Sequence, residues 1–112
     1  MGRKSGLGEF EQLVLLAILR LKEGAFAPEV ADELEESVGR SVTRGALYST
    51  LNRMEEKGWV VWETEEPGPG RGGHIRRRFS VTDAGLAELR LSRQTLLTLW
   101  DGLEGLLSGG GR

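Results

Sequence analysis

The chain has 112 residues, of which 38% are hydrophobic and 29% charged, and this composition is typical of one small globular domain. It contains no cysteine and a single histidine, His74, so disulfides, thiolate metal sites and histidine-rich metal centres are excluded. We therefore expect no metal and no cofactor. Because neither a basic-apolar leader nor a long apolar run is present, we expect a cytoplasmic protein without membrane contact.

Charge is distributed unevenly along the chain. The formal net charge of −2 argues against nucleic acid, because phosphate binding depends on Lys and Arg replacing condensed counterions. However, acidic residues gather between positions 29 and 36, whereas arginines gather elsewhere. These arginines are Arg40, Arg44, Arg53, Arg71, Arg76, Arg77 and Arg78. The chain is therefore polarised, and the total charge does not decide between binding partners.

Two helices are expected in the first third of the chain. Apolar residues recur at helical spacing on both sides of residues 9–21, so this helix needs neighbours on two faces, including a partner surface. A second helix is expected from Ala27, with Pro28 in its first turn, and Gly39 is expected to end it.

Residues 43–57 predict a third helix with two different faces. Thr43 is a suitable N-cap, and Gly58 is a suitable left-handed stop. With the apolar residues packed inward, the 100° step per residue places polar, groove-reading side chains outward. The residues assigned to DNA contact are Thr43, Arg44, Gly45, Tyr48, Ser49, Asn52 and Arg53. The alternative is an ordinary solvated helix face.

Two short strands are expected over residues 59–65 and 75–81, joined by a Gly- and Pro-rich loop that is not helical. The tip of this hairpin is basic and suits a sugar-phosphate backbone or a minor groove. The residues assigned to DNA contact are Arg71, Gly72, Gly73, His74, Arg76 and Arg78. Strand alternation puts Arg77 and Phe79 on the other face. The alternative is a tip whose charges only maintain solubility.

Thr82 is expected to cap a last helix over residues 83–107, whose apolar residues follow a near-heptad seam interrupted by Arg93. One small domain cannot bury so many leucines, so symmetric association through this helix and the first helix is expected. The residues assigned to the dimer interface are Leu15, Leu19, Leu96, Leu97, Trp100, Leu103 and Leu107. Leu86 and Leu89 are expected to cover their own domain instead.

The order of these elements defines the expected fold class. It is mainly α with a small β-hairpin, a winged helix-turn-helix followed by a C-terminal dimerisation helix. Residues 7–82 would form the winged-helix DNA-binding domain, and residues 83–108 would form the dimerisation helix of the same compact unit.

Several stretches between about residues 7 and 93 resemble the PadR family of transcriptional regulators. They are Leu7-Gly8-Glu9-Phe10-Glu11-Gln12, Arg44-Gly45-Ala46-Leu47-Tyr48-Ser49-Thr50-Leu51, Met54-Glu55-Glu56-Lys57-Gly58, Arg71-Gly72-Gly73, Arg77-Arg78-Phe79-Ser80-Val81-Thr82 and Ala84-Gly85. The resemblance implies a winged-helix homodimer that binds double-stranded DNA at an inverted-repeat operator and usually represses transcription, with inducers acting through the dimer.

The chain departs from the family pattern in two places. Family members commonly carry a Tyr-Gly pair where this chain reads Phe26-Ala27-Pro28, so contacts from the second helix are not carried over. The C-terminal region is one helix, which resembles the short-tailed branch of the family.

Because some members stack planar ligands between tryptophans at the dimer centre, Trp100 is a candidate for binding a small aromatic inducer. A tryptophan that only packs in the dimer core is the alternative.

Two other classes of function are alternatives to DNA binding. A winged-helix protein-interaction module would use the third helix or the hairpin to bind a protein, and it would lack the steep salt dependence of DNA binding. An enzyme is not expected, because no nucleophile–base pair or metal cluster is visible and residues 68–73 lack the Lys-Ser/Thr of a P-loop.

Overall fold

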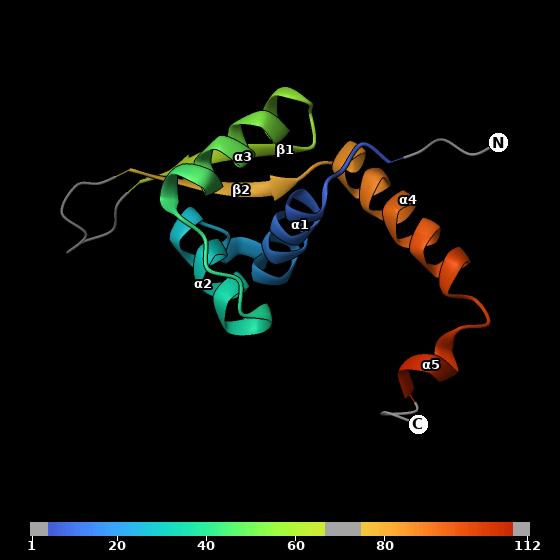
Figure 1. Ribbon diagram of the computed structural model, residues 1–112. Helices are drawn as coiled ribbons and strands as arrows, with labels where there is room; N and C mark the ends of the chain where they lie inside the picture. Colours follow the sequence, from blue (N-terminus) through green and yellow to red (C-terminus); the bar gives the residue numbers. More distant parts are fainter. Residues whose placement is uncertain (1–4, 67–74, 109–112) are drawn as a thin grey trace.

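Three helices and a two-stranded hairpin form the body of the protein, and a fourth helix extends away from it (Figure 1). The computed structural model describes residues 5–66 and 75–108. The elements in chain order are α1 (Glu9–Leu21), the 3-10 turn η1 (Lys22–Gly24), α2 (Ala27–Val38), α3 (Arg44–Glu56), β1 (Val60–Glu65), β2 (Arg76–Val81), α4 (Asp83–Trp100) and α5 (Glu104–Ser108). The expected fold class, mainly α with a small hairpin in a winged helix-turn-helix, is confirmed.

The ends of the helices follow the capping residues in the sequence. The Thr43 hydroxyl accepts a hydrogen bond from the backbone N–H of Ala46 at 3.1 Å and so satisfies a free donor in the first turn of α3. Gly39 after α2 and Gly58 after α3 adopt left-handed conformations, with φ of 68° and 81°. Such positive φ values cost glycine little, which is why both helices end there.

The hairpin is antiparallel, with Val60 of β1 opposite Val81 of β2. On the other edge of β2, the N–H of Phe79 donates to the carbonyl oxygen of Ala25 at 2.9 Å. The segment between η1 and α2 therefore serves as a very short third strand. It places the start of α2 directly beside the hairpin.

The core lies where α1, α2, α3 and the hairpin meet. Its most deeply buried side chains are Val14, Leu15, Val30, Leu47, Leu51, Met54 and Val60. Leu15 is 0% exposed, so the prediction that it belongs to a dimer interface is wrong. Because α1 packs against both α2 and β2, only Leu16 and Leu19 of its apolar residues remain exposed.

The start of α4 is bound tightly to the end of α3. The Thr82 hydroxyl accepts a hydrogen bond from the N–H of Gly85 at 3.0 Å and donates one to the carbonyl oxygen of Gly58 at 2.6 Å. Gly85 is buried, and a β-carbon at this position would collide with the backbone carbonyl oxygen of Trp59. The absence of a side chain at residue 85 therefore allows α4 to approach β1.

The last helix differs from the prediction of one helix over residues 83–107. It ends at Trp100, and α5 begins at Glu104. Gly102 between them has a φ of 86°, and its N–H donates to the Glu104 carboxylate at 3.1 Å. A glycine in the left-handed region interrupts helical hydrogen bonding, so α4 does not continue into α5.

Within the described ranges, no helix combines the length and the apolar character that crossing a membrane requires.

Replacing Gly85 by Ala should lower the free energy of unfolding by about 1–3 kcal/mol, because the new methyl group must displace the backbone at Trp59. Chemical denaturation would measure the change. Gly24→Ala is the matched control, since a β-carbon there meets nothing within 4 Å. Equal stability of the two variants would contradict the close approach of α4.

Candidate nucleic-acid interface

The outer face of α3 is polar and exposed, as the sequence predicted for most of its residues. Leu47, Leu51 and Met54 point into the core and fix the rotation of the helix. The exposed residues of the predicted set are Thr43, Arg44, Gly45, Ser49, Asn52 and Arg53. The hydrogen-bonding side chains among them suit base edges and phosphates, and the glycine permits close backbone approach.

Tyr48 differs from the rest of this set. It is half-buried and lines a groove of about 530 Å³ between α3 and the first turns of α2, together with Ala27, Pro28 and Arg44. The sequence placed Tyr48 on the outward face, but its position one residue after Leu47 turns part of the ring towards the core. Its contribution to a surface is therefore limited to the exposed part of the side chain.

Arg53 is held by groups of its own chain. Its guanidinium lies 3.5 Å from the carboxylate of Glu11 on α1 and 3.5 Å from the hydroxyl of Thr50. The Glu11 carboxylate also accepts the N–H of Gly8 at 2.8 Å, at the start of α1. The side chain of Arg53 remains 49% exposed, so this ion pair orients it without covering it.

The two strands of the hairpin, β1 and β2, form the wing of the winged helix. Four of the residues predicted to contact DNA, Arg71, Gly72, Gly73 and His74, lie outside the described residues. The other two, Arg76 and Arg78, are both paired with carboxylates. Arg76 lies 3.1 Å from Glu29 of α2, and Arg78 lies 3.0 Å from Glu63 of β1. The sequence analysis did not predict these pairs, because Glu29 is 47 residues from Arg76 in the chain and the register that places Glu63 opposite Arg78 was not assigned.

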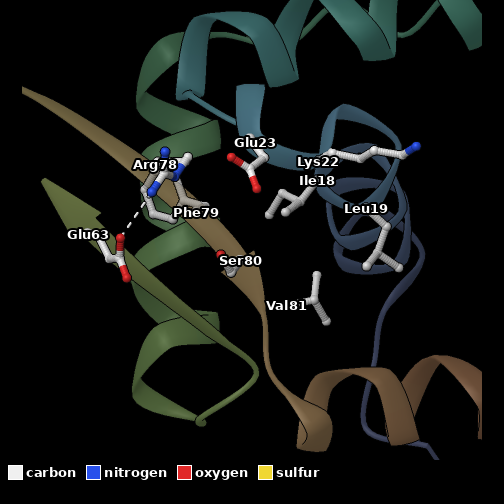
Figure 2. Close-up of a pocket in the computed structure, with 9 residues that line it drawn as sticks. All are labelled: Ile18, Leu19, Lys22, Glu23, Glu63, Arg78, Phe79, Ser80 and Val81. Carbon is white, nitrogen blue, oxygen red and sulfur yellow. Dashed lines mark hydrogen bonds and ion pairs between the residues drawn. The ribbon is translucent and has the colours of Figure 1, made fainter. Parts of the chain in front are cut away.

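Arg78 lines a cavity of about 400 Å³ between the hairpin and the end of α1 (Figure 2). Ile18, Phe79 and Val81 contribute apolar atoms to it. Figure 2 shows the guanidinium of Arg78 directed at Glu63 and the amino group of Lys22 pointing away from both. Side chains from both faces of β2 therefore line this cavity, Arg78 and Ser80 from one face and Phe79 and Val81 from the other.

Arg77 lies on the opposite face of β2 from Arg76 and Arg78, as the alternation of the strand predicted. It is exposed, and its guanidinium stacks over the ring of Trp62 at 4.5 Å from the centroid. One signal in the sequence pointed to this difference: Glu63 and Glu65 share a face of β1, and antiparallel pairing opposes them to Arg78 and Arg76.

The acidic residues of α2 are partly engaged in similar pairs. The Glu33 carboxylate accepts hydrogen bonds from the Ser37 hydroxyl at 2.6 Å and from Arg20 at 2.7 Å. These hydrogen bonds lower the pKa of Glu33, so it stays ionised to lower pH than a free carboxyl. Two acidic residues of α2, Glu33 and Glu29, are therefore paired with arginines of the same chain, on α1 and β2.

A second surface, on α1, α4 and α5, is apolar. Of the residues predicted for a dimer interface, those that are exposed are Leu19, Leu96, Leu97, Trp100, Leu103 and Leu107. Leu16, Leu99 and Leu106 extend the surface and were not in the predicted set. Leu89 is buried at 8% exposure and Leu86 is half-buried, and the two line a groove of about 360 Å³ between α1 and α4.

The fold and the exposed third helix define a winged helix-turn-helix protein. The model of the PadR-like family of transcriptional regulators matches residues 15–91, and the chain belongs to this family. The resemblance noted in the sequence is thereby confirmed.

Solved structures agree with this assignment. A PadR family transcriptional regulator from Eggerthella lenta is 28% identical with a TM-score of 0.64, and the match covers 88% of this chain and 86% of that chain. A PadR-like transcriptional regulator from Bacillus cereus is 22% identical with a TM-score of 0.68 and coverages of 88% and 90%. Bacillus subtilis PadR, solved in complex with operator DNA, is 18% identical with a TM-score of 0.59 and coverages of 72% and 45%. The comparison with curated proteins found no match.

Thr43→Ala should destabilise the protein by about 1 kcal/mol, because the N–H of Ala46 loses its hydrogen-bond acceptor at the start of α3. Thermal or chemical unfolding would measure the change. Ser41→Ala removes an exposed hydroxyl that has no hydrogen bond within the described part of the chain, so it should leave stability unchanged. An equal loss in both variants would argue against the cap.

Proposed function

We propose that the protein is a sequence-specific DNA-binding transcriptional regulator that acts as a homodimer on an inverted-repeat operator and represses transcription. The observation that carries this proposal is the outer face of α3. It exposes Arg44, Ser49, Asn52 and Arg53 on a helix whose other face is fixed in the core. A rigid helix with exposed hydrogen-bonding side chains suits insertion into a major groove.

Family membership and one structural neighbour support the same function. The family is one of transcriptional regulators, and the B. subtilis PadR structure contains operator DNA. The N-terminus of α3 adds a local attraction for phosphate, because the positive end of the helix dipole and the exposed Arg44 coincide there. A dimer bound over a promoter would repress by occupying it.

The homodimer is proposed from the apolar surface on α1, α4 and α5. The exposed fractions of Leu96, Leu97 and Leu103 are 53%, 45% and 43%, which is unfavourable for a protein in water. Removing such side chains from water is worth roughly 1.5–3 kcal/mol each when burial is complete. A second copy related by a two-fold axis would cover these residues with its own equivalent surface.

Trp100 lies within this surface and is assigned to the dimer contact. It lines a shallow groove with Leu97, Glu104 and Leu107. A planar aromatic inducer stacked on the indole is the alternative role, since the ring is 38% exposed and an aromatic face suits such a ligand.

Selection of bound sequences from a random duplex library should recover an inverted repeat, and affinity for it should fall steeply with salt. Asn52→Ala should weaken binding by about 1–3 kcal/mol and relax selectivity at one base position in each half-site. Gln94→Ala removes an exposed amide from α4 and is the matched control. A folded protein that enriches no duplex at low salt would overturn DNA binding and favour a protein-interaction module.

Leu97→Glu should shift the protein from dimer to monomer, because burying a carboxylate at the apolar contact costs free energy where burying the leucine gains it. Analytical ultracentrifugation over a concentration series would measure the shift. Thr98→Glu should leave the dimer intact, because Thr98 lies roughly 100° further around α4 and faces away from the side that carries Leu96 and Trp100. Equal sedimentation of Leu97→Glu and the unmodified protein would place the interface elsewhere.

A further inference from the structure

Three consecutive arginines on β2 occupy two different faces of the hairpin. In the antiparallel register, Arg76 lies opposite Glu65, Arg77 opposite Thr64 and Arg78 opposite Glu63. Because side chains alternate along a strand, Arg76 and Arg78 share the face that carries the two carboxylates. Arg77 lies on the other face of the hairpin.

The first arginine, Arg76, connects the wing to the start of α2. One of its terminal nitrogens lies 3.1 and 3.2 Å from the two carboxylate oxygens of Glu29, and its guanidinium stacks over Phe26 at 3.7 Å from the ring centroid. Its side chain is only 28% exposed. To reach a phosphate, Arg76 would have to give up both the charge-assisted hydrogen bonds to Glu29 and the stacking on Phe26.

The third arginine, Arg78, is held on its own hairpin. It lies 3.0 Å from Glu63 and 3.4 Å from Glu65, and its side chain is 32% exposed. Two acidic neighbours offset its single positive charge. A phosphate brought to this position would meet more negative than positive charge.

The second arginine, Arg77, differs from the other two in its exposure and in its lack of an acidic partner. It is exposed, and within residues 5–66 and 75–108 it forms no ion pair with a carboxylate. Its guanidinium lies over Trp62, whose indole N–H is buried without a partner among these same residues. The ring is held by its packing against the hydrophobic core, and it orients the arginine without consuming any of the five N–H donors of the guanidinium.

We propose that Arg77 is the arginine of β2 that contacts a DNA phosphate, whereas Arg76 and Arg78 stay in intramolecular ion pairs and hold the wing in place. This inference rests on the proposed DNA-binding function and identifies which positive charge of the wing strand acts in it. It replaces the sequence-based expectation that Arg76 and Arg78 make the contacts.

The test compares the salt dependence of operator binding for three single variants, Arg76→Gln, Arg77→Gln and Arg78→Gln. All three remove one positive charge from neighbouring positions, so they serve as matched controls for one another. A lost phosphate contact lowers the slope of log K against log salt by about 0.9 per contact, or about twice that for a dimer on two half-sites. Only Arg77→Gln should show this loss, and Arg77→Lys should retain the slope.

Thermal unfolding of each variant without DNA separates folding defects from lost contacts. Arg76→Gln should unfold at a lower temperature, because Glu29 and Phe26 lose their shared partner, whereas Arg77→Gln should unfold close to the unmodified protein. The slopes are then compared at a temperature below all the transitions. Affinity of Arg76→Gln is expected to fall at constant slope if the wing becomes misplaced.

The outcomes separate this proposal from the proposed function. If the unmodified protein binds an operator and Arg76→Gln or Arg78→Gln lowers the slope as much as Arg77→Gln, the division among the three arginines is wrong. If it binds and no variant changes the slope, the contact by Arg77 is wrong while the DNA-binding function stands. If the unmodified protein binds no duplex, the proposed function itself fails.

Discussion

The close approach of α4 to the backbone of Trp59 is the constraint on which the arrangement of the two surfaces depends. Gly85 allows this approach because it has no side chain, and the Thr82 hydroxyl bridges the end of α3 to the start of α4. Two hydrogen bonds from the segment before α1 reinforce the same junction, since the N–H of Gly6 and the hydroxyl of Ser5 donate to the Glu88 carboxylate. The apolar helix therefore leaves the winged-helix body in a fixed direction.

This junction connects the proposed dimer to the proposed DNA contact. In a symmetric dimer, the orientation of α4 relative to α3 determines how far apart the two third helices lie. The distance between half-sites of an operator follows from that separation.

Electrostatic pairing explains how a chain with a net charge of −2 can present positive surfaces. Acidic side chains on α2 and β1 pair with Arg20, Arg76 and Arg78, so these charges are neutralised where they hold elements together. Arg44 and Arg77 are left exposed without such partners within the described part of the chain. The distribution of pairs, and not the total charge, therefore determines where a polyanion can bind.

The amino-acid sequence by itself determined the three helices and the hairpin of the winged helix, together with the inward and outward faces of α3 and its cap at Thr43. These features depend on interactions between residues close in sequence, such as helical spacing, capping hydroxyls and glycines with positive φ. Only the tertiary structure decided the burial of Leu15, the half-burial of Tyr48 and the pairing of Arg76 with Glu29, 47 residues away in the chain. It also showed that the last helix ends at Trp100. The reason is physical: whether a side chain is buried, or a charge neutralised, depends on which distant segment packs beside it, and the spacing of residues along one element does not contain that information.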